Sequence, residues 1–537
     1  MQLKTFNIAA LALAAFVPKI SQGEERRPNV LFIMTDQQRW DAMGCAGNPE
    51  IKTPNIDRLA KGGVRFINAY SSCPVSAPAR TSILTGHTIF NVKVLKNGDV
   101  YNDDIPDLQT FDQILSLNGY RTEHYGKWHV PDRFASKYDN AVKASGKWNG
   151  SYIPSTSTAE EFRQYIDELG LPARKPNANE LIDKRTQRPY TPLPIDGRYG
   201  MKEGDNQGGI RNKKKSKEDD SDSQEKDFGI IEDDSVDATI AAYEGSEALK
   251  ALKRMDPEKP FSLTCSFVPP HPSFIVHKQY ADLYKISDLS VPASINDNLV
   301  NAPYQRKNTP FDHRFQDPEM IKQMKLVYYG MITQVDDWVG KLLDELDRKG
   351  LSDNTLIVFV SDHGEMLGDH GMKSKLKMYE GSAHVPLIMR FPGVIPAGTK
   401  VATPVSHHDI FATVLDYTGM KIPENDGRSL KNLINGKNDP VDYAVSAWGD
   451  IKNGGPFMVR KGDWKLIAFL QMPDKKQSSV SALYNLKTDP LEMNNLIGKN
   501  PEKGKYVKIS GELKQTLKNW MIKTKTPYIN ELEQTGL

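Results

Sequence analysis

The sequence predicts an α/β fold, in which helices cover both faces of a sheet of parallel strands, followed by a smaller C-terminal α+β domain. Two short apolar runs, at 30–35 and 356–360, are rich in β-branched residues and too short for buried helices. Helical patterns stand between these runs, and the pattern changes to short strands after about Asn425. Strands that alternate with helices form a sheet covered on both faces.

The N-terminus is expected to be a secretion signal that spans residues 1–23. Lys4 precedes an apolar run at 8–17, and the small residues Ser21 and Gly23 suit a leader-peptidase site. A buried N-terminal helix is the alternative interpretation. The run is too short to cross a bilayer, and no later segment approaches 18 continuous apolar residues, so we expect no membrane span. The protein is therefore expected to be exported, to the periplasm or beyond.

The remaining elements follow in chain order. A charged stretch at about 205–235 contains too few apolar residues to order itself, and we interpret it as a surface insertion. A large domain at 24–425 and a small domain at 426–537 are expected. The predicted elements are strands Val30–Thr35 and Leu356–Val360, helices Phe111–Asn118, Ala238–Arg254 and Met324–Lys349 (closed by Gly350), strands Tyr443–Trp448, Phe457–Arg460 and Trp464–Phe469, and helix Glu502–Lys523.

Charge and cysteine content exclude several classes of protein. The 70 Lys and Arg residues nearly balance the 68 Asp and Glu residues, so no global field selects nucleic acid or an anionic membrane. The three cysteines are an odd number without metal-type spacing, which argues against a disulfide framework and a thiolate zinc site. Any preference for anions must therefore be local, and stability must come from the core.

Polar pairs directly follow the two strongest predicted strands. Asp36 and Gln37 come after the first strand, and Asp362 and His363 after the later one. The carboxyl ends of strands in an open α/β sheet are where ligands bind. Two carboxylates, an amide oxygen and an imidazole would suit a hard divalent cation, Ca²⁺ rather than zinc. An Asp after a strand is otherwise usually the N-cap of a helix.

The segment 76–86, SAPARTSILTG, favours a ligand site over a simple helix cap for these polar pairs. Taken alone, Ser76 would be the N-cap of a helix that begins near Pro78. The segment nevertheless resembles, position by position, the signature of the type I sulfatases: Cys or Ser, then Pro two residues on, Arg four residues on, and Thr-Gly five and six residues after the Arg. Cys73 does not fit this register, because Val75 and Ala77 stand where Pro and Arg would be required.

The resemblance extends from about Pro28 to about Pro501 and implies an alkaline-phosphatase-like fold, with a large, mixed but mostly parallel sheet sandwiched by helices. Gly126-Lys127-Trp128-His129 and the segment 270–274, PHPSF, resemble family motifs that line the site. Lys375 stands four residues before Tyr379, as the family's sulfate-binding Lys does, and this spacing favours it over Lys373 and Lys377. The catalytic residues that the resemblance implies are Ser76, Arg80, Lys127, His129, His271 and Lys375.

The resemblance also implies a modified nucleophile and a metal. Ser76 would be converted to formylglycine by a serine-type sulfatase-maturating enzyme. The implied ion is Ca²⁺ in preference to Mg²⁺, and its implied ligands are Asp36, Gln37, Ser76, Asp362 and His363. Gln37 departs from the Asp of many relatives and removes one negative charge from the metal shell. His384 stands where Arg is common, and we assign it to substrate binding or to the support of the site.

Together these features predict hydrolysis of sulfate monoesters, with a sulfated carbohydrate as the expected substrate. In the predicted mechanism Arg80 fixes the hydrated formylglycine, and Lys127, Lys375 and His271 stabilise the sulfuryl oxygens. His271 or Lys375 protonates the leaving group, and His129 removes the proton that allows sulfate to leave. The alternatives are a phosphate or phosphonate ester hydrolase of the same superfamily and a glycan-binding descendant without activity.

Overall fold

The computed structural model describes residues 26–135, 162, 164–171, 181–182, 189–192, 228–232, 235–306, 313–448, 455–470 and 479–537. The predicted signal at 1–23 and most of the predicted insertion lie outside these residues. One part of the insertion is described: Phe228–Ile231 form strand β7, which pairs in parallel with β9 (Phe274–His277). The segment FGII, which the prediction placed within the insertion, is apolar enough to join this sheet.

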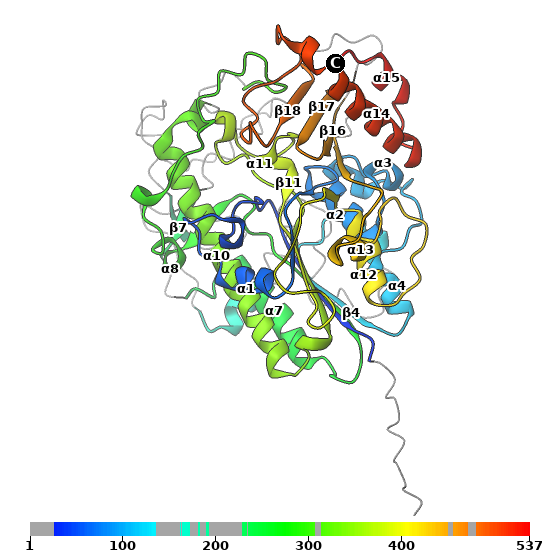
Figure 1. The fold of residues 1–537 in the computed structure, drawn as a ribbon. Coiled ribbons are helices and arrows are strands. Elements are labelled where there is room, and N and C mark those ends of the chain that lie inside the picture. Colours follow the sequence, from blue (N-terminus) through cyan, green and yellow to red (C-terminus); the bar gives the residue numbers. More distant parts are fainter. Residues whose placement is uncertain are drawn as a thin grey trace, which may run out of the picture.

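A seven-stranded mixed sheet forms the centre of the large domain (Figure 1). Among its described strands, β12 alone runs against the others, since it pairs antiparallel with both β10 and β2 while the other pairings are parallel. The predicted large, mostly parallel sheet is confirmed. In spatial order the strands are β13 (Thr399–Val401), β2 (Val64–Phe66), β12 (Leu387–Arg390), β10 (Thr355–Ser361), β1 (Asn29–Thr35), β8 (Phe261–Ser266) and β4 (Arg121–Gly126).

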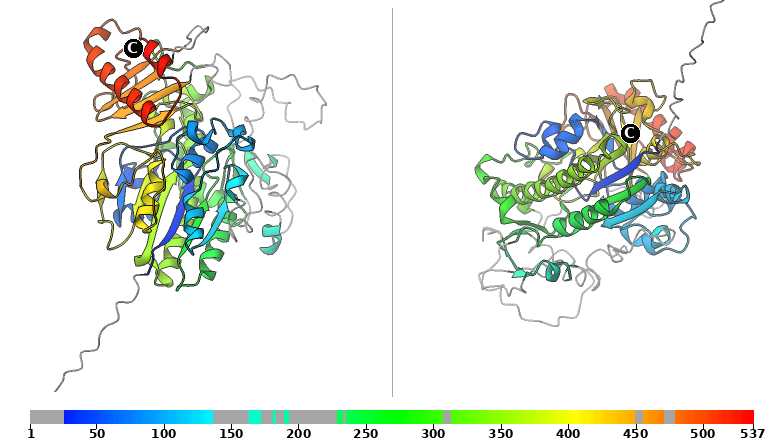
Figure 2. Two further views of the ribbon diagram at one scale, coloured as in Figure 1. Left: turned by 90° about the vertical axis from the view of Figure 1, so that its right-hand side faces the viewer. Right: turned by 90° about the horizontal axis from the view of Figure 1, so that it is seen from below.

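Helices cover both faces of this sheet, as Figures 1 and 2 show. Alternate residues of β1 enter two different cores: Val30 and Phe32 face one helix layer, and Leu31 and Ile33 face the other. Every residue of β1 and β10 is buried, which explains their continuous apolar sequences. The first layer is α2 (Ser76–Thr85), α4 (Phe111–Leu117), α12 (Asp409–Tyr417) and α13 (Lys431–Ile434), and the second is α1 (Pro54–Lys61), α7 (Ile240–Arg254) and α10 (Pro318–Arg348).

The ends of these helices follow from local sequence signals. Helix α4 begins with a capping box, in which Thr110 and Gln113 each accept a hydrogen bond from the other's backbone N–H. Helix α10 begins six residues earlier than the predicted Met324, because Asp317 caps it and Pro318 occupies its first position. Gly350 closes α10 as predicted, with a left-handed φ of 65°.

The small C-terminal domain packs a four-stranded antiparallel sheet against helix α14 (Val507–Lys523). Residues up to Ile434 still pack into the core of the large domain, so the small domain begins after the predicted residue 425. It lies beyond the carboxyl ends of the central strands (Figure 1). Its elements are β15 (Tyr443–Ala447), β16 (Pro456–Lys461), β17 (Trp464–Phe469), β18 (Ala482–Asn485), α14 and α15 (Ile529–Gln534).

Shorter elements surround the central sheet. Three strands, β11, β3 and β14, form a small sheet near its carboxyl edge, and β5, β6, β7 and β9 form another at the periphery. The bounds are β3 (Ala69–Tyr70), β5 (Leu181–Ile182), β6 (Pro189–Pro192), β11 (His384–Val385), β14 (Val405–Ser406), α3 (Ile89–Val92), α5 (Asp132–Ala135), α8 (Lys278–Ala281) and α11 (Glu380–Ala383).

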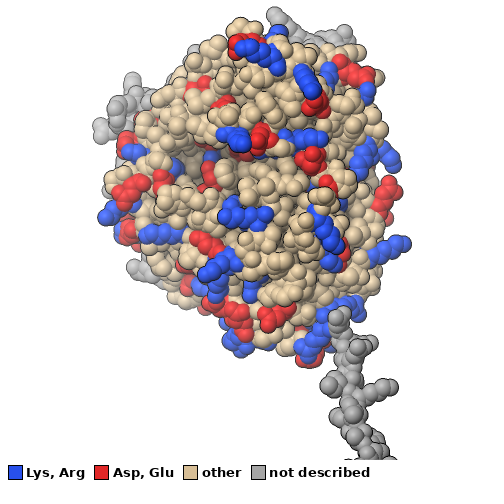
Figure 3. All heavy atoms as spheres, in the orientation of Figure 1, with Lys and Arg blue, Asp and Glu red and all other residues tan. Residues whose placement is uncertain are grey.

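The surface agrees with the near-neutral net charge. Basic and acidic side chains are interspersed over the face shown in Figure 3. Within the described residues, no helix is both long and apolar enough to cross a membrane.

Candidate active site

The two polar pairs at the strand ends meet as predicted. Strands β1 and β10 pair in register, with Thr35 opposite Ser361, so Asp36 and Asp362 leave the sheet side by side. Gln37 turns the chain away from the sheet with a left-handed φ of 69°. The Tyr328 hydroxyl holds this turn by donating to the Gln37 carbonyl at 2.6 Å. The carboxyl edge of the central sheet therefore carries the site.

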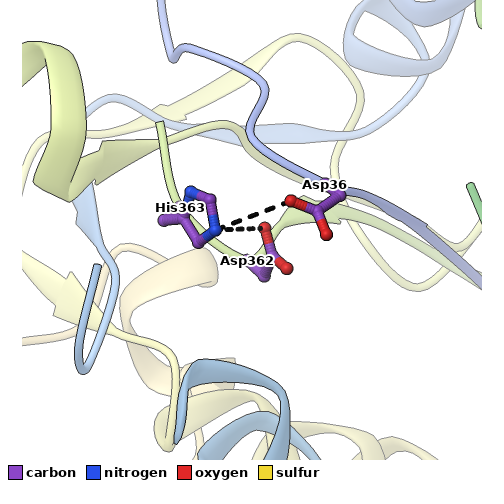
Figure 4. Close-up of side chains that lie close together, drawn as sticks. All are labelled: Asp36, Asp362 and His363. Atoms are coloured by element: carbon purple, nitrogen blue, oxygen red, sulfur yellow. Dashed lines mark ion pairs between the residues drawn. The ribbon is translucent and has the colours of Figure 1, made fainter. Parts of the chain in front are cut away.

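Asp36, Asp362 and His363 converge in an arrangement that fits a divalent cation (Figure 4). Their ligand atoms all lie within 4.8 Å of one another, and His363 Nε2 lies 3.5 Å from Asp36 Oδ1 and from Asp362 Oδ1. Asp36 Oδ1 is buried and has no hydrogen-bond partner among the described residues. A buried, unpaired carboxylate oxygen is costly unless a cation or donor meets it, so these residues fit a metal.

The tautomer of His363 suits metal binding. Its Nδ1 lies 3.0 Å from the carbonyl oxygen of Gly364, which can only accept a hydrogen bond. The proton is therefore on Nδ1, and the lone pair of Nε2 faces the two carboxylates. Burial lowers the pKa of His363 to about 4, so the imidazole is neutral at physiological pH.

Ser76 lies at the first position of helix α2, two residues before the predicted start. Val75, in an extended conformation, is the N-cap, so Ser76 does not cap this helix. Its side chain instead faces the cation site: Oγ lies 3.0 Å from His363 Nε2 and 3.4 Å from Asp36 Oδ2. The residue is 1% exposed. The arrangement presents a hydroxyl to the same small volume as the ligand atoms.

Arg80, one helical turn after Ser76, is fixed by three partners. Its Nε donates to Asp362 Oδ2 at 2.7 Å, and one terminal nitrogen donates to Ser266 Oγ at 2.8 Å and to the Lys127 carbonyl at 3.1 Å. The other terminal nitrogen lies 3.6 Å from Asp36 Oδ2 without a hydrogen bond to a described residue. The guanidinium is thus locked in place with one donor left for the site.

Lys127 and His129 reach the site from the segment that follows β4. Lys127 forms an ion pair with Asp36 Oδ2, and its Nζ lies 3.5 Å from Ser76 Oγ. His129 is 3% exposed, and neither ring nitrogen has a hydrogen-bond partner in the part of the chain described. Burial and the charges of Lys127 and Arg80 lower the pKa of His129 well below its usual value. The ring is therefore a neutral base.

Lys375 and His271 are the remaining two of the predicted catalytic residues. The Lys375 ammonium donates to Gln37 Oε1 at 2.8 Å, and burial lowers its pKa to about 8. Burial, followed by the charge of Lys375, lowers the pKa of His271 well below its usual value. The Nδ1 of His271 contacts the Pro272 carbonyl at 2.6 Å.

The electrostatic balance of the site favours an anion beside the carboxylates. Burial alone would raise the pKa of Asp36, but the charges of Lys127, His271, Lys375 and Arg80 outweigh burial and hold it well below its usual range. Asp362 is likewise ionised, because the charges around it outweigh burial. The carboxylates therefore stay available to a metal, while the cationic side chains can face a negatively charged substrate group.

His384, assigned from sequence to substrate binding or support, makes contacts within the protein. Its Nδ1 lies 2.8 Å from Glu380 Oε2, and its Nε2 lies 2.8 Å from the Ile67 carbonyl. The ring stacks on Trp40 at 4.5 Å and on Tyr70 at 5.0 Å between centroids. These contacts favour a supporting role.

Two residues of the site were missed by the sequence interpretation. Ser266, at the end of β8, holds Arg80. Its position at the end of a third buried strand could have indicated this, because β8 ends at the same edge as β1 and β10. Glu365, two residues after His363, was not assigned to the site, yet it accepts a hydrogen bond from the side-chain amide of Gln37.

Known protein families and relatives match most of this chain. A family model described as "Sulfatase" matches residues 28–420, and one described as "N-sulphoglucosamine sulphohydrolase, C-terminal" matches residues 368–523. The chain is similar to an arylsulfatase of Clostridium perfringens, with 30% identity over 88% of this chain and 90% of that protein. It is also similar to an N-acetylglucosamine-6-O-sulfatase of Bacteroides thetaiotaomicron, with 29% identity over 95% of this chain and 89% of that protein.

A solved structure also shares the fold. It holds its substrate, D-glucosamine-2-N,6-O-disulfate, and superposes with a TM-score of 0.66 and 23% identity, covering 95% of this chain and all of the other.

Proposed function

We propose, from the premise that this chain belongs to the sulfatase family, that it hydrolyses sulfate esters of a carbohydrate, with Ser76 converted to formylglycine as its nucleophile. The family makes the chain a sulfuric ester hydrolase. The observation that carries the proposal is the position of Ser76 Oγ, 3.0 Å from His363 Nε2 and 3.4 Å from Asp36 Oδ2.

Asp36, Gln37, Asp362, His363 and the modified Ser76 would hold the metal. Two carboxylates and an amide oxygen favour a hard cation, and we propose Ca²⁺ in preference to Mg²⁺, because Ca²⁺ accepts irregular oxygen-rich geometry. When bound, such a cation lowers the pKa of a neighbouring hydroxyl and neutralises charge that develops on the substrate.

Formylglycine explains why an ordinary serine is insufficient. Its hydrate supplies one hydroxyl that attacks sulfur and a second whose deprotonation allows sulfate to leave and the aldehyde to re-form. The conversion requires a serine-type sulfatase-maturating enzyme, which we propose as a partner. The buried thiol of Cys73 lies three residues away outside the signature register, and burial raises its pKa far above the usual value.

The cationic side chains would bind and polarise the sulfate group. Lys127 contacts Asp36 and Lys375 contacts Gln37, so the two lysines approach from different segments and can contact different non-bridging oxygens. The terminal nitrogen of Arg80 that makes no hydrogen bond to a described residue can donate to a hydroxyl at position 76.

Two buried groups can exchange protons with the reacting atoms. His129 is neutral and has no described hydrogen-bond partner, so it can accept the proton that is lost as sulfate departs. Lys375, whose pKa is lowered to about 8, can donate a proton to the leaving alcohol near physiological pH. The lowered pKa of His271 leaves its ring neutral, which favours Lys375 over His271 as this donor.

A sulfated carbohydrate is the proposed substrate class. It is supported by the name of the Bacteroides relative, an N-acetylglucosamine-6-O-sulfatase, and by the disulfated glucosamine bound in the similar structure. The expected N-terminal signal supports export to the periplasm or beyond.

Paired substrates would test the reaction. The protein, produced together with a serine-type maturating enzyme, should release sulfate from an aryl sulfate faster than phosphate from the matching aryl phosphate. Sulfated glucosamines should be hydrolysed with a higher kcat/KM than the aryl sulfate. Faster phosphate release would instead assign the chain to phosphate ester hydrolysis, and binding of sulfated sugars without turnover would indicate a non-catalytic descendant.

A further inference from the structure

Glu365 is a buried carboxylate that the predicted mechanism does not use. It lies two residues after His363 and is 1% exposed. Its Oε2 accepts a hydrogen bond from the side-chain amide of Gln37. Its Oε1 accepts from the backbone N–H of Leu367 at 3.1 Å and from the backbone N–H of Ser374. Three donors from three parts of the chain therefore meet on one side chain.

These partners determine which way the Gln37 amide points. Lys375 has only donors, and it lies 2.8 Å from one end of the amide, so that end must be the carbonyl oxygen. A carboxylate has only acceptors, so the end that contacts Glu365 must be the NH₂ group. The two neighbours agree, and Glu365 thereby turns the carbonyl oxygen of Gln37 toward Lys375.

Glu365 also fixes the loop that carries Lys375. The loop leaves at Leu367 and returns at Ser374, and the same carboxylate oxygen binds the backbone N–H of both residues. Ser374 and Leu376, on either side of Lys375, have φ values of 64° and 73°, which non-glycine residues rarely adopt. Such a backbone persists only where its surroundings hold it, and Glu365 supplies one of the contacts.

We propose that Glu365 is a positioning residue, which aims the Gln37 carbonyl at the cation site and holds Lys375 beside it. The inference rests on the proposed function, because the cation and the sulfate group are the partners of these two side chains. It also explains the departure at Gln37. An aspartate at that position would bring a second buried carboxylate toward Glu365, whereas an amide satisfies both the carboxylate and the cation.

The isosteric substitution Glu365→Gln changes the orientation of the Gln37 amide without changing the volume of the side chain at 365. In Glu365→Gln, the introduced amide must keep its oxygen toward Leu367 and Ser374, since reversing it would oppose two backbone donors. Its NH₂ group would then face the NH₂ group of Gln37. Rotation of the Gln37 amide relieves this clash but turns its NH₂ group toward Lys375 and the cation. We therefore expect Ca²⁺ to bind at least about tenfold more weakly, as is typical when an outer-shell partner is lost.

Exchanging the side chains at positions 37 and 365 should restore the Ca²⁺ affinity that Glu365→Gln loses. In the double substitution Gln37→Glu with Glu365→Gln, the amide at 365 donates to one oxygen of the carboxylate at 37. The other oxygen then faces Lys375 and the cation. The net charge of the pair and its volume are unchanged, so the double variant should regain the Ca²⁺ affinity of the unsubstituted protein or exceed it.

The measurement is Ca²⁺ affinity by titration calorimetry on the full-length protein. Production without the maturating enzyme leaves Ser76 as serine in every variant, so the result does not depend on turnover. Glu492→Gln is the matched control, because Glu492 is also buried and accepts a backbone hydrogen bond, from Glu380 N at 2.6 Å. In the part of the chain that the structure describes, Glu492 makes no hydrogen bond or ion pair with Gln37 or Lys375. Its Ca²⁺ affinity should be unchanged.

The outcomes distinguish this inference from the proposed function. Equal affinity in Glu365→Gln and the unsubstituted protein would overturn the positioning role. A double variant as weak as Glu365→Gln would also overturn it, because a merely structural role predicts no recovery. Failure of the unsubstituted protein to bind Ca²⁺ would overturn the proposed Ca²⁺ site and the inference with it. If Ca²⁺ binds but protein produced together with the maturating enzyme has no sulfatase activity, the proposed function alone is rejected.

Discussion

Gly364, between His363 and Glu365, has no room for a side chain. A Cβ added there would lie 2.1 Å from the Gly381 carbonyl oxygen, 3.1 Å from its carbonyl carbon and 3.3 Å from the His384 carbonyl oxygen. All three atoms belong to the backbone, so no side-chain rotation can relieve the contact. Replacing this glycine by alanine must therefore separate the loop after β10 from helix α11.

The cost of Gly364→Ala can be estimated from the structure. Overpacking a buried site costs about 1–3 kcal/mol. Separation of the two segments also weakens the hydrogen bond from Gly364 N to Ser382 O, now 2.8 Å, which contributes about 1 kcal/mol. We expect the free energy of unfolding to fall by about 2–4 kcal/mol. Because His363 moves with the loop by roughly 1 Å, kcat/KM should fall by about 100-fold.

Urea unfolding and sulfate release from an aryl sulfate would measure the two effects. Gly98→Ala is the matched control, since Gly98 is exposed and no heavy atom lies within 4 Å of its added Cβ. The control should retain the stability and activity of the unsubstituted protein. Unchanged stability and unchanged kcat/KM in Gly364→Ala would refute the close approach of the loop to α11.

Three further predictions follow from the charges of the site and its surroundings. Arg80→Met should lower the free energy of unfolding by about 3–5 kcal/mol, because Asp362 loses a buried partner. Added Ca²⁺ should restore part of the lost stability in urea unfolding, and no restoration would contradict the cation site. Chelation should abolish sulfate release, and activity that survives exhaustive chelation would argue against a metal. Ca²⁺ added back to the chelated protein at about 100 times its Kd should raise the free energy of unfolding by about 2.7 kcal/mol. Burial lowers the pKa of His124 to about 4, so the unfolded state binds its proton first as the pH falls. His124 should therefore contribute about 3 kcal/mol to the loss of stability between pH ~6.5 and pH ~4, in addition to other buried histidines such as His363. His124→Gln should make this loss smaller by about that amount in unfolding curves taken across that pH range.

Much of the fold could be predicted, because its signals are local. The continuous apolar sequences of β1 and β10 reflect burial on both faces, and caps mark the ends of α4 and α10. The start of α10 was misplaced because the periodic pattern is clearer than the cap at Asp317 that determines it. The short strand β12, which alone opposes its neighbours in the described sheet, carries no sequence signal of its direction.

The site was predicted by two independent patterns. The strand-end pairs indicated where Asp36 and Asp362 would meet, and the resemblance supplied Ser76, Lys127 and Lys375. Contacts between distant residues could not be read from either pattern. Glu365 holds Gln37 across 328 positions of the chain, and Ser266 holds Arg80 across 186. Such pairs depend on how the strands are ordered in the sheet, which local sequence does not specify.

The central claim is that Ser76 acts only after conversion to formylglycine. The direct measurement is the mass of the tryptic peptide 66–80, FINAYSSCPVSAPAR, in preparations with and without a serine-type maturating enzyme, alongside sulfate released per protein molecule. We predict that the peptide from the active preparation lacks two hydrogens and that multiple turnover rises in proportion to the converted fraction. Full multiple turnover from a preparation whose peptide retains the complete serine mass would contradict the account.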